Sequence, residues 1–553
     1  MKIVLVQPPV SDFYDTAIRL QPIGLCYIKS ALNKYLPEAD VLIRDYHAGH
    51  GRKTVPVPEE LSYLKDYYPV ADKSPFSTFH QYYHFGRSFE NIEAEIDEIA
   101  PDLIGISSLF TPYYRDALEI AERVRKRHDA PVIMGGPHVS EVPQEVLALP
   151  YIDYVIVGEG ERPMVEFIRF LLGRVKLEDV PNLGYKRNNR LYFNPVSENY
   201  PIDELPIPDL SGLPAEHYQL GEKSLAFMIT SRGCPHRCSF CSVHTTFGNN
   251  YRRRPVENII EEINQRYREG RRVIDFEDDN LTFHKDEFKE LCRRVIDLFP
   301  DKEMEFVAMN GISYMSLDDE LLELMQRAGF THLNLALVSS DKSIHETTKR
   351  PYSIGAYTRV VNKAFQLGLK IVSYQILGLP DEGLPGMIQT LAFNSRLPVL
   401  LGASPFYLTP KSPVAMGMNL TGADYVKARL TAMAADSSLF TRDDIYTLFV
   451  TTRIINFLKG LDMADDADIS ELMNQSRRDK RAATGIELLR VLRQEGVLYF
   501  HTSRGNIENK KFKTELFRDV IREAEYITCQ NGRRIAVRSL FKQHMLFTPW
   551  MKP

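Results

Sequence analysis

Three cysteines lie close together in the middle of the chain, at Cys234, Cys238 and Cys241. Three thiols in one short loop make a poor disulfide framework, because one of them is always left over. They are also one ligand short of a tetrahedral zinc site, unless His236 or His244 supplies the fourth ligand. They suit a 4Fe–4S cluster in which the protein holds three irons and leaves the fourth open for a small molecule.

The residues on either side of the cysteines indicate the elements that present them. An apolar run that begins at Phe227 predicts a strand, and Arg232-Gly233 opens the loop that carries the thiols. Pro255 begins a helical pattern that reaches Glu269, since proline suits the first position of a helix. A reactive loop between a strand and a helix is typical of a parallel barrel, in which catalytic groups follow the carboxyl ends of the strands.

The spacing Cys-x3-Cys-x2-Cys, with Phe240 directly before the last cysteine, resembles the signature of the radical S-adenosylmethionine (SAM) enzymes. The resemblance implies that Phe240 contributes to the cofactor site and that the open iron chelates the methionine moiety of SAM. It also implies reductive cleavage of SAM to a 5′-deoxyadenosyl radical, with an electron donor such as flavodoxin or ferredoxin. A structural zinc loop and unrelated reduced cysteines are the alternatives.

Five further strand patterns follow the cysteine loop, and helical patterns separate them. With the strand before the loop they make six, which is enough for a partial parallel barrel and too few for a closed eight-stranded one. The expected strands cover residues 272–276, 304–308, 332–337, 370–377 and 401–408.

Two loops of this barrel are expected to complete a SAM site. An acidic loop follows the second strand, and carboxylates at a barrel mouth accept hydrogen bonds from an ammonium group. The resemblance assigns this role to Glu277 and Asp278. It assigns adenine contacts to Ile376 and Gly378, with the acidic end of that motif at Asp381.

Two features of the barrel leave alternatives open. Val338-Ser339-Ser340 stands after the fourth strand, where the family often has a Glu-Ser pair, so the ribose contacts are not assigned. Arg252-Arg253-Arg254 faces either the methionine carboxylate of SAM or solvent at the entry to a helix.

Strands alternate with helices along the first third of the chain, beginning with the β-branched run Lys2 to Gln7. Such alternation predicts a parallel, doubly wound, Rossmann-like sheet whose ligand lies outside the carboxyl ends of the strands. No P-loop and no Gly-x-Gly-x-x-Gly follows the first strand, so a nucleotide site of those kinds is poorly supported. Small and polar residues gather at the expected strand ends, in Gln7-Pro8-Pro9, Ser107-Ser108, Gly135-Gly136-Pro137-His138 and Gly158-Glu159-Gly160-Glu161.

This set of strand ends resembles the cobalamin-binding domain that precedes many radical SAM domains. The resemblance implies that the nucleotide tail of cobalamin lies against these ends, so we expect Gly136→Val to remove cobalamin binding while the fold survives. His47 nearly matches a cobalt-ligating motif but follows the second strand rather than the first, and we interpret it as a loop residue. The implied cobalamin contacts are Ser107, Ser108, Gly135, Gly136, Gly158 and Glu159.

We expect an α/β protein in four parts. A cobalamin-binding domain (1–175) is followed by a linker (176–222) with a hairpin around Asn188-Asn189. A partial (β/α)6 radical SAM barrel (223–412) precedes a mainly helical region (413–553) that shapes or caps the active site. An aromatic-rich insertion at 65–87 suits either of two roles, covering a flat macrocycle or packing onto its own domain, and we favour the packing.

Composition narrows the class of protein. The chain has 553 residues, 44% of them hydrophobic, and a mean hydropathy of −0.26, as in an ordinary globular protein. No apolar run approaches the ~20 residues that a membrane-spanning helix needs. A net charge of −5 gives no reason to expect nucleic-acid binding. Six cysteines, three of them clustered, indicate a reducing compartment and therefore a cytoplasmic protein.

These observations predict a cobalamin-dependent radical SAM enzyme that functionalises an unactivated carbon, most often by methyl transfer from methylcobalamin. One alternative is a radical SAM cyclase or rearrangement enzyme, with or without cobalamin. An alternative of another class is a non-enzymatic iron–sulfur scaffold or sensor, which has no use for an acidic loop beside only three cysteines. The substrate is expected to be a small or lipid-like molecule, and the motifs do not select it.

Overall fold

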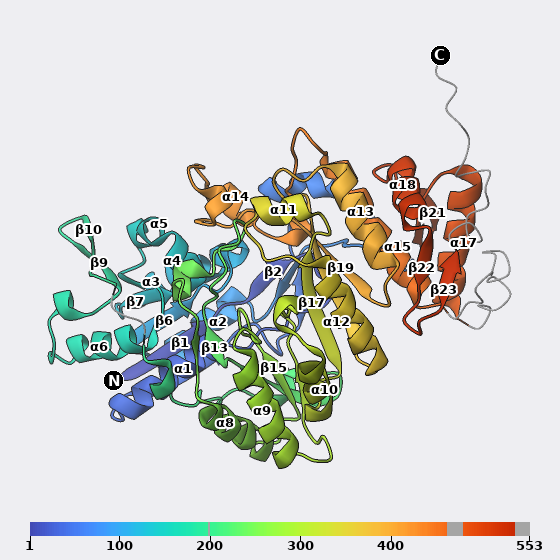
Figure 1. Ribbon diagram of the computed structural model, residues 1–553. Coiled ribbons are helices and arrows are strands. Elements are labelled where there is room, and N and C mark those ends of the chain that lie inside the picture. The colour runs from blue at the N-terminus through green and yellow to red at the C-terminus, as the bar shows by residue number, and fades with distance from the viewer. Residues whose placement is uncertain (197–199, 462–478, 537–553) are drawn as a thin grey trace. The chain divides into compact units, whose positions relative to one another are not determined.

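The computed structural model describes residues 1–196, 200–461 and 479–536 (Figure 1). The chain forms two compact units, each built from segments that are far apart in the sequence. Unit 1 comprises Met1–Val57, Tyr82–Asn310 and Leu408–Ala428. Unit 2 comprises Pro58–Gln81, Gly311–Tyr407 and the described part of Arg429–Pro553. These units do not follow the four expected domain boundaries, which stay predictions.

Five parallel strands form the centre of the N-terminal part of unit 1. β1 (Lys2–Gln7) lies between β3 (Asp40–Asp45) and β6 (Leu103–Ser107). Beyond β6 the sheet continues with β7 (Val132–Gly135) and β8 (Tyr154–Ile156). The strand order therefore reverses between β1 and β6, at the kind of point where doubly wound sheets bind ligands. This order confirms the expected doubly wound sheet.

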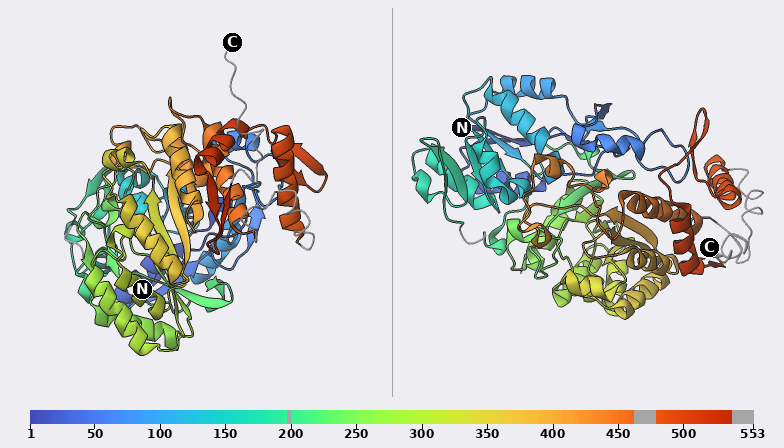
Figure 2. Two further views of the ribbon diagram at one scale, coloured as in Figure 1. Left: turned by 45° about the vertical axis from the view of Figure 1, so that its right-hand side comes forward. Right: turned by 90° about the horizontal axis from the view of Figure 1, so that it is seen from above.

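Helices cover both faces of this sheet, as the views of Figure 2 also show. Successive strand residues point to opposite faces. Val4 and Ile104 are buried against α2, α3 and the short α4 and α5, whereas Leu5 and Ile133 face α1 and α6. The helices are α1 (Ile23–Tyr35), α2 (Phe89–Ile99), α3 (Tyr114–Arg125), α4 (Pro137–Glu141), α5 (Pro143–Ala148) and α6 (Glu161–Leu171).

The predicted hairpin extends one edge of the sheet. β9 (Leu183–Arg187) runs antiparallel to β8 and pairs with β10 (Arg190–Phe193). The two residues between them, Asn188 and Asn189, have φ values of 51° and 59°. Asparagine tolerates this left-handed region, which a two-residue hairpin turn requires at both positions.

Unit 1 also holds the first strands of the expected barrel. β12 (Lys223–Met228), β15 (Val273–Phe276) and β16 (Glu305–Val307) pair in parallel, and the two-residue β11 (Gln219–Leu220) pairs antiparallel to β12. The connections contain α8 (Val256–Arg268) and α9 (Lys285–Leu298), which alternate with the strands as the sequence predicts.

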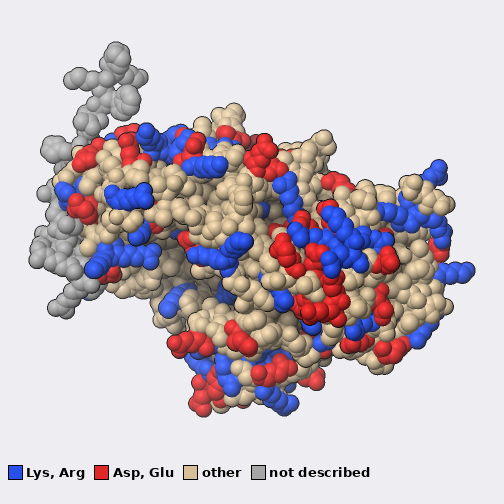
Figure 3. Space-filling view, turned by 180° about the vertical axis from the view of Figure 1, so that it is seen from behind, with Lys and Arg blue, Asp and Glu red and all other residues tan. Residues whose placement is uncertain are grey.

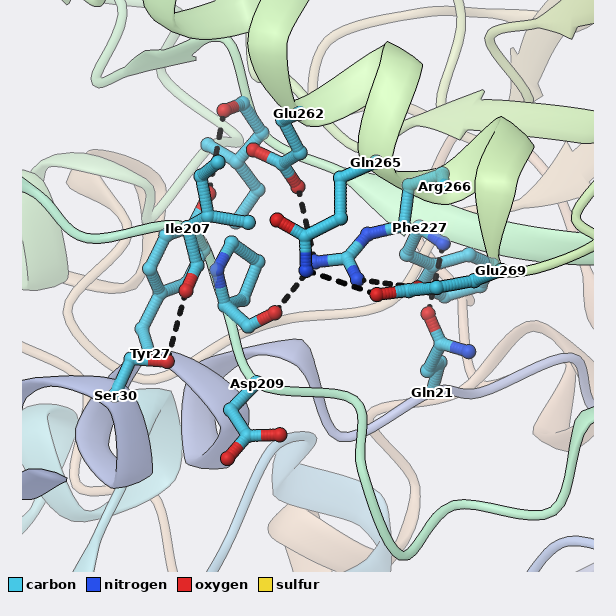
Figure 4. Close-up of polar contacts among 12 residues, drawn as sticks. Gln21, Tyr27, Ser30, Ile207, Asp209, Phe227, Glu262, Gln265, Arg266 and Glu269 are labelled. Atoms are coloured by element: carbon cyan, nitrogen blue, oxygen red, sulfur yellow. Dashed lines mark hydrogen bonds and ion pairs between the residues drawn. The ribbon is translucent and has the colours of Figure 1, made fainter.

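The proline-rich linker is held to these helices by a buried arginine. Arg266 of α8 is flanked by Glu262 and Glu269, and its Nη1 lies 2.7 Å from Glu269 Oε2 (Figure 4). The same guanidinium donates to the carbonyl oxygen of Pro208 in the linker. Ser30 Oγ of α1 donates to the carbonyl oxygen of Ile207, the linker residue before Pro208, at 2.8 Å. The linker is therefore fixed both to α1 and to α8.

Unit 2 contains three more parallel strands, β17 (His332–Val338), β18 (Lys370–Leu377) and β19 (Leu400–Pro405). Each unit thus contributes three consecutive parallel strands to the six that the sequence predicts. The helices of this part are α10 (Asp319–Ala328), α11 (Lys342–Thr347), α12 (Ile354–Gln366) and α13 (Leu384–Ser395).

The described C-terminal region combines helices with two antiparallel hairpins. Lys459, at the end of α15, is buried and its Nζ donates to four carbonyl oxygens, which fastens this helix to the end of α13 and to β22. The elements are α15 (Arg442–Lys459), α17 (Lys480–Glu495), α18 (Thr514–Ala524) and the pairs β20 (Tyr499–Thr502) with β21 (Gly505–Glu508) and β22 (Tyr526–Thr528) with β23 (Arg534–Ala536).

The aromatic insertion packs on a different region from the one we expected. Its residues 65–81 lie in unit 2, where the Tyr67 hydroxyl donates to Asp443 Oδ1 and the rings of Phe79 and Phe449 stack 6.1 Å apart. The expectation that these aromatics pack onto the N-terminal domain is therefore wrong for this stretch. Aromatic composition predicts burial but not the partner, because any apolar surface satisfies it.

Charges of both signs are mixed on the face of the molecule that Figure 3 shows. Salt bridges of the helical layer, such as Arg123 with Glu119 at 2.6 Å, pair charges of opposite sign. In the stretches that the structure describes, no helix combines the length and the apolar character that crossing a membrane requires.

Candidate functional site

The cysteine loop, residues 233–251, is closed at its base by a short ladder. β13 (Ser231–Arg232) pairs antiparallel with β14 (Arg252–Arg253). Gly233 opens the loop with a φ of +79°, and a Cβ there would lie 2.5 Å from the Asn250 carbonyl oxygen. Only glycine takes this conformation without strain, so Arg232-Gly233 sets the path of the chain into the loop.

The three cysteines of the loop are free thiols. Burial raises the pKa of Cys234 and raises that of Cys241 to about 11, so a metal centre that binds thiolates must displace protons here. The side-chain amide of Asn280 donates to Cys234 Sγ at 3.6 Å, a contact that favours a thiolate. Three thiols in one loop with such a donor fit a 4Fe–4S cluster, and Cys234, Cys238 and Cys241 would hold it.

The described residues contain no group of three His, Cys, Asp or Glu side chains that converge as the ligands of a single metal ion do. A 4Fe–4S cluster takes one thiolate at each of three irons and does not require such convergence. Phe240, between Cys238 and Cys241, is half-buried in the same loop. Its contribution to the cofactor site stays a prediction.

Asp278 of the acidic loop has structural partners. Its carboxylate accepts hydrogen bonds from Thr230 N at 3.1 Å, from Thr230 Oγ1 at 2.7 Å and from Ser231 Oγ. Both oxygens are used, and the residue is buried. Asp278 therefore ties the end of β12 to the base of the cysteine loop, and this position does not suit the contact with the SAM amino group that we expected.

Glu277 fits that contact better. It is half-buried, and Asn310 Nδ2 donates to its Oε2 at 2.7 Å. Burial, together with the nearby Asp275, raises the pKa of Glu277 to about 8. A cation beside this carboxyl would restore its ionised form. The pKa of the neighbouring Asp279 is raised to about 6 by burial, and that carboxylate accepts from Gly233 N at 3.1 Å.

A cavity of about 220 Å³ lies where the order of the N-terminal sheet reverses. That volume is many times the ~10–15 Å³ that one water molecule needs. Apolar side chains of β1, β6, β7, α1 and α6 form most of its wall. Five of the six expected cobalamin contacts line it, namely Ser107, Gly135, Gly136, Gly158 and Glu159.

Ser108 is the exception. It is buried behind Gly136, its amide donates to the Gly135 carbonyl oxygen at 2.8 Å, and its own carbonyl accepts from His138 N at 3.2 Å. Gly136 has a φ of +108°, and a Cβ there would lie 2.7 Å from the Ser108 carbonyl oxygen. The expectation that Gly136→Val leaves the fold intact is therefore wrong, because the clash is with backbone. At Gly135 the nearest atom to such a Cβ is 3.8 Å away.

The cavity fits the tail of cobalamin on two structural grounds. Glycines at the ends of adjacent strands leave room for a ring-sized group to approach the backbone. Among the described side chains of the wall, Glu161 Oε2, Gln21 Nε2 and Arg232 Nε are buried without a hydrogen-bond partner. Burial of an unsatisfied acceptor is costly, and the amide and hydroxyl groups of cobalamin would supply a donor.

Glu159 and Glu161 also form ion pairs with the base of the cysteine loop. Arg232 Nη1 lies 2.8 Å from Glu159 Oε2, and its Nη2 lies 2.5 Å from Glu161 Oε1. Arg252, opposite Arg232 in the ladder, also pairs with Glu159. Burial by itself lowers the pKa of Arg232, but the two carboxylates outweigh that effect and raise it.

The run Arg252-Arg253-Arg254 does not simply face solvent at the start of α8. Arg254 is 1% exposed and its Nη1 lies 2.6 Å from Glu262 Oε2. Arg253 donates to the carbonyl oxygen of Leu281 at 3.2 Å. The solvent alternative is therefore wrong, because these guanidiniums connect the ladder to neighbouring elements of unit 1.

His47 lies in a loop, as we interpreted it. Its Nε2 is 2.8 Å from the Ile18 carbonyl oxygen, and its Nδ1 is 3.3 Å from that of Phe85. Asp45 Oδ1 accepts from the amides of His47 and Ala48, which forms a local turn. The near-match to a cobalt-ligating motif is thus accounted for by turn chemistry.

In unit 2, Gly378 follows β18 with a φ of +84°. A Cβ there would lie 3.0 Å from both Phe440 Cζ and Ile445 Cδ1, so close packing with the C-terminal region already requires glycine. Ile376 is half-buried near the end of β18. The adenine contacts of Ile376 and Gly378 stay predictions.

The buried acidic residue after β18 is Glu382 and not Asp381. Asp381 is exposed with a φ of +66°, whereas Glu382 is buried and accepts from Ser339 Oγ at 2.8 Å. Burial raises the pKa of Glu382 to about 7. Val338, before that serine, has a φ of +74°, which is rare for a β-branched residue and marks strain at the end of β17.

Sequence reasoning missed the role of residues 408–428. This segment belongs to unit 1, where Val414 N donates to the Ser239 carbonyl oxygen in the cysteine loop at 2.8 Å. Farther along, the Tyr425 hydroxyl donates to Glu145 at 2.9 Å, and its ring lies 5.6 Å from that of His138.

Two family models match the chain. The model described as B12 binding domain matches residues 78–168, and the model described as Radical SAM superfamily matches residues 228–393. The first covers the half of the doubly wound sheet that follows β3, and the second begins at the last residue of β12 and contains the cysteine loop.

Among curated relatives, an uncharacterised methyltransferase of Pyrococcus horikoshii is 27% identical over 407 residues, which are 72% of this chain and 79% of the relative. The cytidylyl-2-hydroxyethylphosphonate methyltransferase of Streptomyces wedmorensis is 26% identical over 418 residues, 68% of this chain and 73% of the relative. An anaerobic magnesium-protoporphyrin IX monomethyl ester cyclase of Rubrivivax gelatinosus is 25% identical over 312 residues, 53% and 54% of the two chains.

Two solved structures share the fold. The radical SAM methyltransferase TsrM of Kitasatospora setae, with cobalamin and a [4Fe-4S] cluster bound, has a TM-score of 0.59 at 18% identity, over 77% of this chain and 84% of its own. The cobalamin-dependent SAM radical enzyme OxsB with aqua-cobalamin has a TM-score of 0.62 at 13% identity, over 95% and 79%. The two family models thus match a B12-binding domain followed by a radical SAM domain in this chain, and the two solved structures share its fold.

Proposed function

We propose that this protein is a cobalamin-dependent methyltransferase that uses a 4Fe–4S cluster and SAM to methylate a carbon of a small or lipid-like substrate. The observation that carries the proposal is that one compact unit holds both the three-cysteine loop and the strand-end cavity. The names of the Pyrococcus and Streptomyces relatives support methyl transfer. Thiol-bound iron and a strong reductant such as flavodoxin or ferredoxin suit the cytoplasm.

When bound, the cluster, SAM and cobalamin supply one-electron chemistry and a transferable methyl group. The chain's own residues bind and orient these groups. Cys234, Cys238 and Cys241 hold the cluster, and Glu277 receives the ammonium of SAM. Residues at the ends of β6, β7 and β8 receive the cobalamin tail, and their apolar surroundings exclude water from it.

The test is anaerobic reconstitution with iron, sulfide and hydroxocobalamin, followed by a strong reductant and SAM with a labelled methyl group. We expect about one cobalamin per chain and formation of 5′-deoxyadenosine, measured by absorbance and chromatography. Replacement of the three loop cysteines by alanine should abolish cluster absorption and 5′-deoxyadenosine formation. The matched control is Cys292→Ala, which removes a buried thiol of α9 outside the loop.

A cyclase is the second candidate, because a relative with that name matches about half of the chain. Label from SAM in the organic product supports the methyltransferase, whereas an unlabelled product of unchanged carbon count supports the cyclase. A triple-cysteine variant that keeps its full iron content would contradict both, and would favour an iron site elsewhere in the chain.

A further inference from the structure

The cavity that we assign to the cobalamin tail is not built by the N-terminal sheet alone. Ile229 and Arg232, directly before the cysteine loop, contribute to its wall. Thr246 and Phe247 lie in α7 (His244–Phe247), a short helix within the loop after Cys241, and also contribute. A Cβ at Gly158 would lie 3.3 Å from the Thr246 carbonyl oxygen, so the two parts of the wall are in close contact.

Buried ion pairs connect this shared wall to the base of the loop. The side chains of Arg232, Glu159 and Glu161 are each 4% exposed. The Arg232 guanidinium also lies 5.7 Å from the centre of the Phe247 ring, within range of a cation–π interaction. Arg232 thus contacts the N-terminal domain, α7 and the cavity at the same time.

A second contact lies next to the last cysteine. Glu141, at the end of α4, accepts from Thr111 Oγ1 at 2.9 Å and is hydrogen-bonded to the Ser242 side chain, the residue after Cys241. The cysteine loop is therefore held by carboxylates of the N-terminal domain both before Cys234 and after Cys241. Its own ladder has two residue pairs, so these contacts from outside the loop help to fix its conformation.

We infer that cobalamin binding and cluster binding are thermodynamically linked through Arg232, Phe247, Glu159 and Glu161. A tail in the cavity contacts α7 and the Arg232 side chain, which restricts the cysteine loop to the conformation that holds the cluster. A bound cluster in turn fixes α7 as part of the cavity wall. Linkage makes the effect reciprocal, so each cofactor strengthens the binding of the other by the same factor. This inference rests on the proposed function, and the four residues act as positioning residues.

The test measures the dissociation constant of hydroxocobalamin for cluster-free and cluster-loaded protein, by visible absorbance under anaerobic conditions. We expect the cluster-loaded form to bind at least about five-fold more tightly, the lower end of typical coupling. Phe247→Ala should bring this ratio close to one while the protein stays folded and still takes up iron. The matched control is Phe193→Ala on β10, a 38% exposed ring outside the cavity, which should leave the ratio unchanged.

Arg232→Gln should also bring the ratio close to one, but it leaves the Glu161 carboxylate buried without its cationic partner and Glu159 with Arg252 alone, which endangers folding. Phe247→Ala avoids that risk, since it removes only one aromatic ring from the cavity wall and leaves the ion pairs in place. Equal dissociation constants for the two forms of the wild type would overturn the linkage and leave the proposed function intact. If the Phe247→Ala variant kept the wild-type ratio of dissociation constants, the linkage would not run through Phe247, and this part of the inference would be overturned. Failure of both forms to bind hydroxocobalamin would overturn the proposed function together with the inference.

Discussion

The strand ends of unit 1 and those of unit 2 both carry glycines and acidic residues, but they are used differently. In unit 1, the ends of β6, β7 and β8 border a cavity of about 220 Å³. In unit 2, the end of β18 is filled by its own chain, with Phe440 and Ile445 packed against Gly378. Glu382 likewise has a serine of the neighbouring strand end as its partner.

The difference shows that a glycine at a strand end has no single meaning. Gly135 borders open space, Gly136 touches the backbone of Ser108, and Gly378 touches side chains. All three positions resemble ligand contacts in the sequence. The distance from an added Cβ to its nearest atoms shows whether a glycine borders open space that a ligand can fill or is required by close packing within the protein.

The largest effect is expected for Gly136→Val. The new Cβ meets a backbone carbonyl oxygen at 2.7 Å, and the φ of +108° is unfavourable for valine. We expect a loss of folding free energy of about 3 kcal/mol or more, measured by thermal unfolding. Gly135→Val is the matched control and should unfold close to the wild-type temperature. Equal unfolding temperatures for the two variants would mean that Gly136 also borders open space.

A smaller destabilisation is expected for Gly378→Val in unit 2. Its Cβ meets the ends of Phe440 and Ile445 side chains, which shift more easily than backbone. We expect a cost of about 2 kcal/mol from overpacking and strain. Hydroxocobalamin affinity should stay at the wild-type value, which isothermal titration calorimetry can check. A loss of cobalamin affinity without destabilisation would reverse the contrast between the two units.

Gly24→Leu should affect binding and not stability. Gly24 is the second residue of α1, borders the cavity and would have no atom within 4 Å of an added Cβ. Leucine favours helix, so we expect unchanged or slightly higher stability. Its side chain occupies part of the cavity, so hydroxocobalamin affinity should fall about tenfold, equivalent to ~1.4 kcal/mol. The matched control is Gly355→Leu, at the second position of α12, where an added Cβ also has no atom within 4 Å. If both variants bind equally well, the tail lies elsewhere.

The smallest effect concerns Glu382 and pH. Burial raises its pKa from the ordinary 4.5 to about 7 in the folded protein. The folded state therefore binds more protons than the unfolded state between these values, and stability falls as pH rises from about 4.5 to about 7. Glu382→Gln removes this dependence. We expect the difference in free energy of unfolding between the variant and the wild type to be more favourable to the variant at pH 8 than at pH 5, by on the order of 1 kcal/mol. An identical pH profile of the unfolding temperature in both proteins would show that Glu382 does not carry it.

Much of the fold was predictable because local patterns specify it. β-branched runs and amphipathic helices predicted the alternation of parallel strands and helices, including β18 with its observed bounds, whereas the hairpins of the C-terminal region were not predicted. Asn188-Asn189 predicted a hairpin because few residues accept two left-handed positions. The cysteine spacing predicted the reactive loop, since three thiols within one loop leave few other uses.

By itself, the sequence determined the kind of protein, because cofactor motifs are short stretches of contiguous residues whose chemistry does not depend on distant partners. Only the tertiary structure decided which motif residues are left for a ligand. Asp278 accepts hydrogen bonds from Thr230 and Ser231. Glu159 is paired with Arg232, and Arg254 is paired with Glu262. These partners lie from 8 to 73 positions away along the chain, and several come from other elements. A carboxylate satisfied by such a partner and one that awaits a ligand look the same in a sequence, because burial and hydrogen bonding are properties of the folded chain.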